Sequence, residues 1–142
     1  MDHNAELIVK LAWHYLGTPY KWGGDDPMEG FDCSGFVIEL YQSVGWLPVR
    51  GDWTAHQLYE RAKGRGKLES APVVGGLAFY GSPGRVTHVT VVVDVRGIAY
   101  CIGANAGGSK TLTVDVASQQ NAFVKLRPVG YRADLVSYSR GV

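Results

Sequence analysis

The spacing of apolar residues changes near the middle of the chain. In residues 5–16 apolar side chains recur every three or four positions, and the same spacing returns in residues 36–41 and, more briefly, 58–62. This spacing predicts three helices, because residues three and four apart share one helix face. Beyond residue 70 the chain has short runs rich in β-branched and aromatic residues with turn residues between them. They predict strands at 75–81, 87–95, 97–104, 111–116 and 122–129.

Local signals mark the ends of these elements. Asn4 is expected to cap the first helix and Gly17 to end it, and Thr54 with Gln57 three residues later fits a capping box for the third. A stretch rich in Gly, Pro and Asp, residues 18–30, predicts an ordered loop before the second helix. Arg96 and Gly97 are expected to form a two-residue hairpin turn. Helices first and strands later predict an α+β fold with an antiparallel sheet.

Composition is consistent with one globular domain over residues 1–142. Hydrophobic residues make up 46% of the chain and charged residues 19%. The 14 basic and 13 acidic side chains give a net charge of +1, so the charge balance does not indicate nucleic acid or an anionic membrane surface as a partner.

The sequence shows no targeting or membrane-spanning segment. No stretch approaches the roughly 18 apolar residues of a membrane span, so no membrane insertion is expected. The N-terminus, MDHNAELIVK, is acidic and amphipathic, whereas a signal peptide begins basic and continues apolar. We therefore expect no signal peptide, and the compartment stays open.

The two cysteines, Cys33 and Cys101, are too few for a disulfide-dense scaffold or a thiolate zinc site, although a single bridge stays open. No metal or other cofactor is expected. Cys33 lies where the second helix begins. A cysteine in such a place is more often a buried small residue than a nucleophile. However, the first turn of a helix offers free N–H groups and a positive dipole end, which favour the reactive thiolate.

A nucleophilic cysteine needs a base, and His88 is the best placed of the four histidines. It lies in the strand richest in β-branched residues, where Thr90 and Val92 would share its face and Val89, Val91 and Val93 would pack on the other. A histidine on a rigid strand can act as a base, but it can equally be a sheet histidine bonded to a carbonyl. His3, His14 and His56 are expected to be solvated or to pack structurally.

Three motifs carry a resemblance that the periodicity does not supply. YLGTPYKWGG at 15–24, DCSGFV at 32–37 and HVTVVV at 88–93 occur in this order. Together they resemble the NlpC/P60 family of papain-like cysteine peptidases. The resemblance implies an N-terminal helical half that carries the cysteine, packed on a C-terminal antiparallel sheet that carries the histidine.

The resemblance also implies roles for single residues. Cys33 matches the nucleophile and His88 the base, giving a thiolate–imidazolium pair. Tyr20 matches a tyrosine beside the cysteine that would bind substrate or the oxyanion, and Trp22 would pack beneath the cleft or line it. Asp32 and Ser34 match positions that in relatives recognise the free amino end of a stem peptide. Both are also suited to cap the helix.

In the family a third residue completes a triad with the cysteine and the histidine by orienting the imidazole. At this third position the sequence departs from the family. Relatives carry His, Asn or Gln about a dozen residues after the histidine, and here that count reaches Tyr100. A two-residue turn at Arg96 and Gly97 would place Asn105 opposite His88, which makes Asn105 the candidate to orient the imidazole. A slipped register would favour Cys101, and a backbone group is a further alternative.

Three functions remain to be compared. The resemblance implies hydrolysis of amide bonds in peptidoglycan stem peptides, of the kind between D-γ-glutamyl and a diamino acid. The alternatives are a papain-like amidase or acyltransferase on another substrate and an inactive wall-binding module. The stretch CIGANAGGSK, residues 101–110, resembles phage-associated cell-wall peptidases. That likeness implies delivery to the wall by a phage tail or another secretion partner.

Overall fold

The computed structural model describes residues 2–26 and 30–142, so the loop expected over 18–30 lies partly outside the described residues. The helices are α1 (His3–His14), α2 (Cys33–Ser43), α3 (Ala55–Gly64) and α4 (Val114–Gln119), with a short 3-10 helix, η1 (Val129–Tyr131). The strands are β1 (Asp25–Asp26), β2 (Gly30–Phe31), β3 (Leu68–Glu69), β4 (Leu77–Ser82), β5 (Arg85–Asp94), β6 (Tyr100–Asn105), β7 (Phe123–Pro128) and β8 (Leu135–Ser139). The predicted α+β fold is confirmed.

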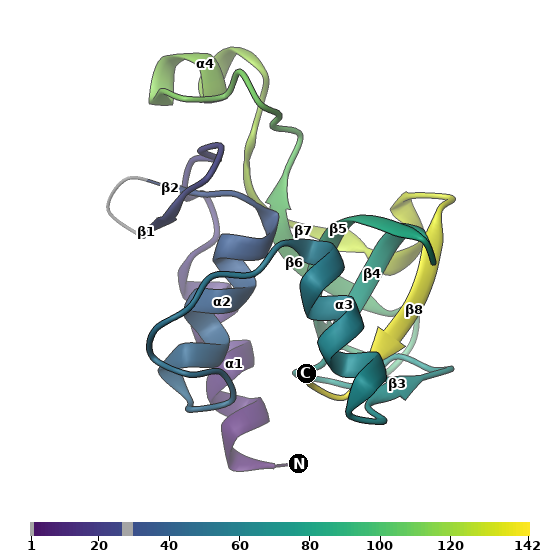
Figure 1. Ribbon diagram of the computed structural model, residues 1–142. Helices are drawn as coiled ribbons and strands as arrows, with labels where there is room; N and C mark the ends of the chain where they lie inside the picture. Colours follow the sequence, from purple (N-terminus) through teal and green to yellow (C-terminus); the bar gives the residue numbers. More distant parts are fainter. Residues whose placement is uncertain (1, 27–29) are drawn as a thin grey trace.

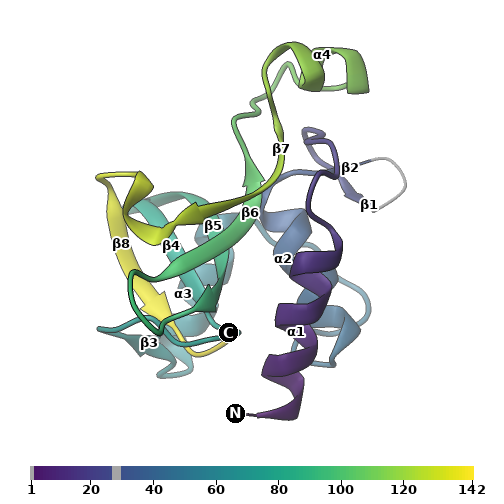
Figure 2. The same ribbon diagram turned by 180° about the vertical axis from the view of Figure 1, so that it is seen from behind.

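One six-stranded sheet carries the second half of the chain. Its strand order is β3-β8-β4-β5-β6-β7, with antiparallel neighbours throughout, and β1 and β2 form a separate pair (Figure 1). Figures 1 and 2 show α1 and α2 side by side at one flank of this sheet, while α3 packs against β5. The helical half therefore packs against strands in the middle of the sheet, chiefly β5.

The β5 strand divides its side chains between two apolar clusters, as its alternation predicts. Val89, Val91 and Val93 join the main core with the helices. Val92 packs on the other face in a smaller cluster that includes Tyr80 and Cys101. Since successive side chains of a strand point to opposite faces, His88 shares the face of Val92.

The second and third helices begin where the sequence predicts, but the first does not. Thr54 and Gln57 form both hydrogen bonds of a capping box at α3. At α1 the predicted cap at Asn4 is wrong, because the Asp2 carboxylate accepts hydrogen bonds from the backbone N–H groups of Asn4 and Ala5. The helix ends at His14, three residues before Gly17, which has a positive φ of 86°.

The predicted hairpin turn at Arg96 and Gly97 is also wrong. Residues 95–99 form a longer loop, in which the Asp94 carboxylate accepts from the backbone and the guanidinium of Arg96. A register shift between Val92 and Asp94 absorbs the extra length, so that Val92 still pairs with Cys101 and Val91 with Ile102. Continued along both strands, this register brings Asn105 across from His88, as a two-residue turn would have done.

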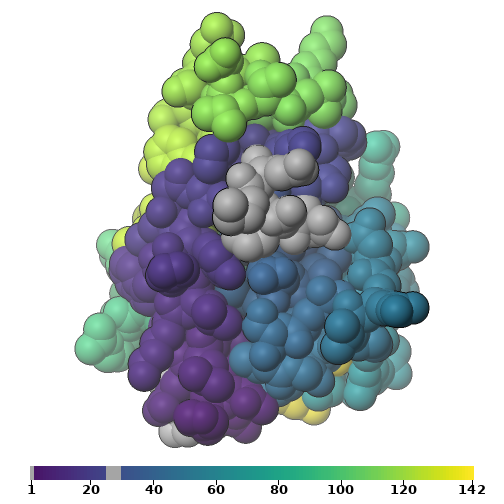
Figure 3. All heavy atoms as spheres, turned by 90° about the vertical axis from the view of Figure 1, so that its left-hand side faces the viewer, coloured from purple at the N-terminus to yellow at the C-terminus, as the bar shows by residue number. Residues whose placement is uncertain are grey.

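The strand predicted at residues 111–116 is wrong, because these residues form the approach, the cap and the first turn of α4. The Thr113 hydroxyl accepts from the backbone N–H of Val116, which caps α4, and Asp115 lies in its first turn, where a negative charge is favoured. Residues 106–121 leave the sheet after β6 and return at β7, and they form the top of the molecule in Figures 1 and 3. We call residues 106–121 the excursion. A hydrogen bond from the backbone N–H of Trp22 to the Thr111 carbonyl joins the excursion to the N-terminal loop.

Four strands were not anticipated: the separate β1–β2 pair, and β3 and β8 of the six-stranded sheet. β8 pairs with β4 and with β3, and it completes the sheet on the side away from β7. Among the described residues, no helix is both long and apolar enough to cross a membrane.

Candidate active site

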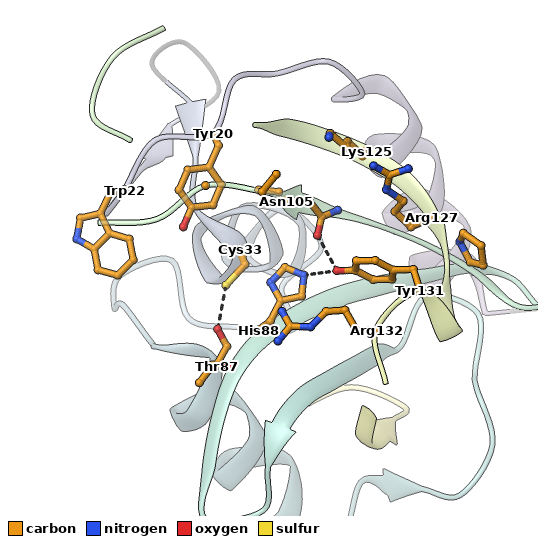
Figure 4. Close-up of a pocket in the computed structure, with 14 residues that line it drawn as sticks. Tyr20, Trp22, Cys33, Thr87, His88, Asn105, Lys125, Arg127, Tyr131 and Arg132 are labelled. Carbon is orange, nitrogen blue, oxygen red and sulfur yellow. Dashed lines mark hydrogen bonds between the residues drawn. The ribbon is translucent and has the colours of Figure 1, made fainter. Parts of the chain in front are cut away.

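A cavity of about 690 Å³ lies where the N-terminus of α2 meets the β5–β6–β7 end of the sheet. Cys33, His88 and Asn105, the predicted triad, all line it, together with Tyr20 and Trp22 (Figure 4). We call this cavity the cleft. Asp32 and Ser34 line a smaller cavity of about 140 Å³ next to it, which also includes Asp52.

Cys33 is the first residue of α2, held there by the cap that precedes it. The Asp32 carboxylate accepts from the backbone N–H of Gly35 at 2.7 Å and of Gly23 at 3.0 Å, and the Ser34 hydroxyl donates to it at 3.3 Å. A Cβ on Gly35 would overlap the Gly24 carbonyl oxygen, so the two glycine-bearing motifs pack directly on each other. The capping interpretation is confirmed for Asp32, while Ser34 supports the cap by its hydrogen bond to the Asp32 carboxylate. Contact of both residues with substrate stays a prediction.

The Cys33 thiol is free and partly buried, and it lines the cleft. Both cysteines are free, so the single bridge left open by the sequence does not form. The Cys33 Sγ lies 3.9 Å from the Thr87 carbonyl oxygen. Burial and the charge of Asp32 raise the pKa of the thiol to about 11, although the backbone of Val89 on β5 and of Ser34 and Cys33 at the helix start opposes them.

The His88 ring is held by a residue that sequence reasoning missed. The Tyr131 hydroxyl lies 2.8 Å from Nε2 of His88 and donates to Oδ1 of Asn105 at 2.8 Å. Asn105 Nδ2 donates to the Gly103 carbonyl, which fixes Oδ1 as the acceptor. Since the Tyr131 proton goes to Asn105, its oxygen accepts from Nε2–H of His88, and Nδ1 is left unprotonated on the Cys33 side of the ring (Figure 4).

The sequence around Tyr131 gives no indication that this residue belongs to the site. It stands at the end of η1, beyond β7 and 43 residues after His88, in a segment without periodicity. Asn105 therefore reaches the site as the register predicts, but the hydrogen bond to the ring Nε2 comes from Tyr131. Cys101, the alternative, is buried beside Tyr80 on β4, with its Sγ 3.9 Å from the Tyr80 hydroxyl, and does not line the cleft.

Burial also sets the protonation state of His88. Burial and the positive charge of Arg132 lower the pKa of the imidazole, the Asn105 amide and the charge of Asp134 partly oppose them, and the resulting pKa is about 4. Both shifts favour the neutral thiol and the neutral imidazole in the unliganded site, because desolvation opposes each charged form. The thiolate–imidazolium pair that the resemblance implies stays a prediction.

Tyr20 and Trp22 form one side of the cleft. The Tyr20 ring is buried, and burial together with the nearby Cys33 and Asp32 raises the pKa of its hydroxyl, which stays a neutral donor. A Cβ at Gly107 would overlap the Tyr20 ring, so Gly107 fixes how closely the excursion covers it. Trp22 is 51% exposed and lines the rim of the cleft.

The described residues do not form a metal site. Within residues 2–26 and 30–142 there is no group of three or more His, Cys, Asp or Glu side chains arranged to hold a metal ion. His56 has the structural role expected of it, since its Nδ1 accepts from the backbone N–H of Val86. The prediction that the chemistry needs no cofactor remains a prediction.

Comparison with known proteins places this arrangement in a family. The profile described as the NlpC/P60 family matches residues 17–132. The crystal structure of the NlpC/p60 domain of the peptidoglycan hydrolase SagA superposes with a TM-score of 0.66 at 32% identity, covering 95% of this chain and 97% of that one.

Two curated relatives extend the comparison. The probable peptidoglycan endopeptidase LytE of Bacillus subtilis is 30% identical over 131 residues, which is 89% of this chain and 34% of LytE. Protein P54 of Enterococcus faecium is 42% identical over 88 residues, which is 62% of this chain and 16% of P54. The chain thus spans about a third or less of the length of these relatives.

Proposed function

The chain belongs to the NlpC/P60 family, and from this premise we propose that it is a cysteine peptidase that hydrolyses amide bonds in the stem peptides of peptidoglycan. The observation that carries the proposal is the placement of Cys33 at the N-terminus of α2 in one cleft with a His88 ring whose Nε2 is already bonded. SagA and LytE, which are named a peptidoglycan hydrolase and a probable peptidoglycan endopeptidase, support the substrate class.

The chemistry begins from a neutral pair. The Cys33 thiol gives its proton to Nδ1 of His88 as its sulfur attacks the carbonyl carbon of the substrate. The imidazolium then gives that proton to the leaving nitrogen as the C–N bond breaks, which leaves an acyl thioester and a free amine. Water, deprotonated by His88, attacks the thioester and releases the carboxylic acid and the thiol.

Tyr131 and Asn105 act as positioning residues in this scheme. Tyr131 accepts the Nε2–H bond and holds the ring in the tautomer that leaves Nδ1 unprotonated, and Asn105 holds Tyr131 through its Oδ1. When His88 becomes an imidazolium, the same Tyr131 oxygen remains an acceptor for the charged ring. The proposal therefore assigns the third position of the triad to the Tyr131–Asn105 pair.

The remaining predicted residues bind substrate. The neutral Tyr20 hydroxyl beside Cys33 donates to the oxyanion or to a substrate carbonyl, and Trp22 covers the peptide at the rim. We assign the free amino end of the stem peptide to the small cavity of Asp32, Ser34 and Asp52, where two carboxylates suit an ammonium group. The bond cleaved is of the D-γ-glutamyl–diamino acid type implied by the resemblance to the family.

Digestion of purified sacculi tests the function. The native protein is expected to release soluble peptides whose mass identifies the cleaved amide, and Cys33→Ala is expected to release none. Sacculi left intact by the native protein would contradict the peptidase and favour a wall-binding module. Cleavage of other amides with sacculi untouched would favour a papain-like amidase or acyltransferase.

A further inference from the structure

One side of the cleft carries three cationic side chains that the chemistry above does not use. Lys125 and Arg127 on β7 and Arg132 after η1 line the cleft, and of the described residues that line it none is Asp or Glu. Arg132 already forms a two-point ion pair with Asp134, at 2.7 and 2.9 Å. Lys125 and Arg127 are therefore the cations most available to a ligand.

The sheet register explains how these cations reach the cleft. Asn105 pairs with Phe123 and Gly103 with Lys125, so Lys125 and Arg127 alternate onto the face that carries Asn105. Lys125 is only 7% exposed, and its Nζ lies 4.6 Å from the centroid of the Phe123 ring. Burial and the charge of Arg127 lower the pKa of this ammonium. A ligand carboxylate would relieve both effects.

The direction of the reaction decides which part of a substrate lies there. His88 must hand its proton to the leaving nitrogen, so the leaving fragment lies on the His88 side of Cys33. Figure 4 shows Lys125, Arg127 and Arg132 on that side, and Tyr20 and Trp22 on the opposite one. The cations thus face the fragment that is released as the amine.

We propose that Lys125 and Arg127, assisted by Arg132, bind a carboxylate on the leaving fragment, so that the cleft selects stem peptides whose diamino acid carries a free carboxylate. The inference rests on the proposed peptidase function and deepens it. Of the diamino acids found in stem peptides, a diaminopimelate has a carboxylate on its side chain and lysine has none. Amidation of that carboxylate removes the charge and leaves the size nearly unchanged.

Two matched peptides test the inference. They are L-Ala–γ-D-Glu–meso-diaminopimelate and the same tripeptide amidated at the side-chain carboxylate of the diaminopimelate. Binding to Cys33→Ala protein is measured by calorimetry, and cleavage by native protein as kcat/KM. The free acid is expected to bind and to react about 10-fold better or more, since hydrogen bonds to charged groups are among the strong ones.

Charge variants assign the preference to residues. Arg127→Gln and Lys125→Met are expected to bring the ratio between the two peptides towards 1. Arg85→Gln removes an exposed cation at the start of β5, outside the cleft, and is expected to keep the ratio. The preference should also weaken as salt is raised.

The outcomes separate the two proposals. Equal binding and equal kcat/KM for the two peptides, or a preference that survives both charge variants, would overturn the carboxylate site while leaving the peptidase intact. Cleavage of neither peptide and of no sacculi by native protein would overturn the peptidase. In that case the binding ratio alone would decide the carboxylate site, and absence of binding at millimolar peptide would overturn it too.

Discussion

The phenol oxygen of Tyr131 lies 2.8 Å from Nε2 of His88. Because the same hydroxyl donates to Asn105, the ring is linked to the amide through a phenol. A positioning residue contributes by holding the base in one tautomer and one orientation, so its loss lowers the rate without removing the chemistry.

Tyr131→Phe is expected to lower kcat about 10- to 100-fold with little change in KM, the range found when residues that orient a metal-bound histidine are replaced. Asn105→Ala should lower kcat less, since the phenol still contacts His88 without it. The double variant should be no worse than Tyr131→Phe, because both substitutions break one chain of hydrogen bonds. Tyr100→Phe, at an exposed tyrosine of β6, is the control. Full activity in Tyr131→Phe would contradict the assignment.

The raised pKa of Cys33 predicts how the thiol reacts without substrate. With a pKa of about 11, the thiolate fraction at pH 7 is small, and the rate of iodoacetamide alkylation should rise about tenfold per pH unit between pH 7 and 10. Cys33→Ala, which keeps only the buried Cys101, gives the background rate. A rate that is already constant above pH 6 would instead support the thiolate–imidazolium pair expected from the sequence.

The lowered pKa of His88 predicts a dependence of stability on pH. Between the ordinary value of 6.5 and about 4, the unfolded chain binds a proton that the folded protein excludes. The free energy of unfolding should therefore fall as the pH falls through this window, by about 3 kcal/mol in total, and should not change above it on account of His88.

Urea unfolding at pH 7, 6, 5 and 4 measures this dependence. His88→Gln should flatten the fall, whereas His14→Gln, at an exposed histidine of α1, should keep it. The window lies above the range in which Asp94, with a pKa lowered to about 2 by Arg96, takes up its proton. An equal fall in native and His88→Gln proteins would show that other groups carry it.

Local signals predicted the parts of the site that a few neighbouring residues determine. Asp32 caps α2 and so places Cys33 at its N-terminus, and the alternation in β5 places His88 opposite the main core. The pairing of Asn105 with His88 was predicted from a two-residue turn that does not form. The pairing is nevertheless right, because the bulge after Val92 compensates for the longer loop. A rule that counts residues from a turn cannot predict such a compensation.

The parts that failed depend on contacts between distant segments. Tyr131 meets His88 only after β7 has joined the sheet, and nothing within a few residues of it indicates a role. Residues 111–116 alternate like a strand, but they pair with no strand of the sheet, and Thr113 caps a helix that begins at Val114. The shifts in the pKa values of Cys33 and His88 also follow from burial, which a sequence does not give.

Gly107 supplies the last prediction, because it tests whether the close cover of Tyr20 matters for activity. A methyl at Gly107 would overlap the Tyr20 ring, whereas one at Gly108 would meet nothing within 4 Å. Neither glycine has a positive φ, so the two substitutions differ in the space available and not in backbone strain. Overpacking of this kind costs about 1–3 kcal/mol when neighbours must shift.

Gly107→Ala is therefore expected to displace Tyr20 from Cys33 and to lower kcat/KM on sacculus-derived peptides about 10-fold, while Gly108→Ala keeps the native rate. Thermal unfolding of both proteins separates displacement of one ring from loss of the fold. Equal activity in the two variants would mean that residues 106–121 can shift away from Tyr20 without loss of activity. The N-terminal loop alone would then hold Tyr20 in position. Loss in Gly107→Ala at unchanged melting temperature would place the effect on the ring that faces the nucleophile.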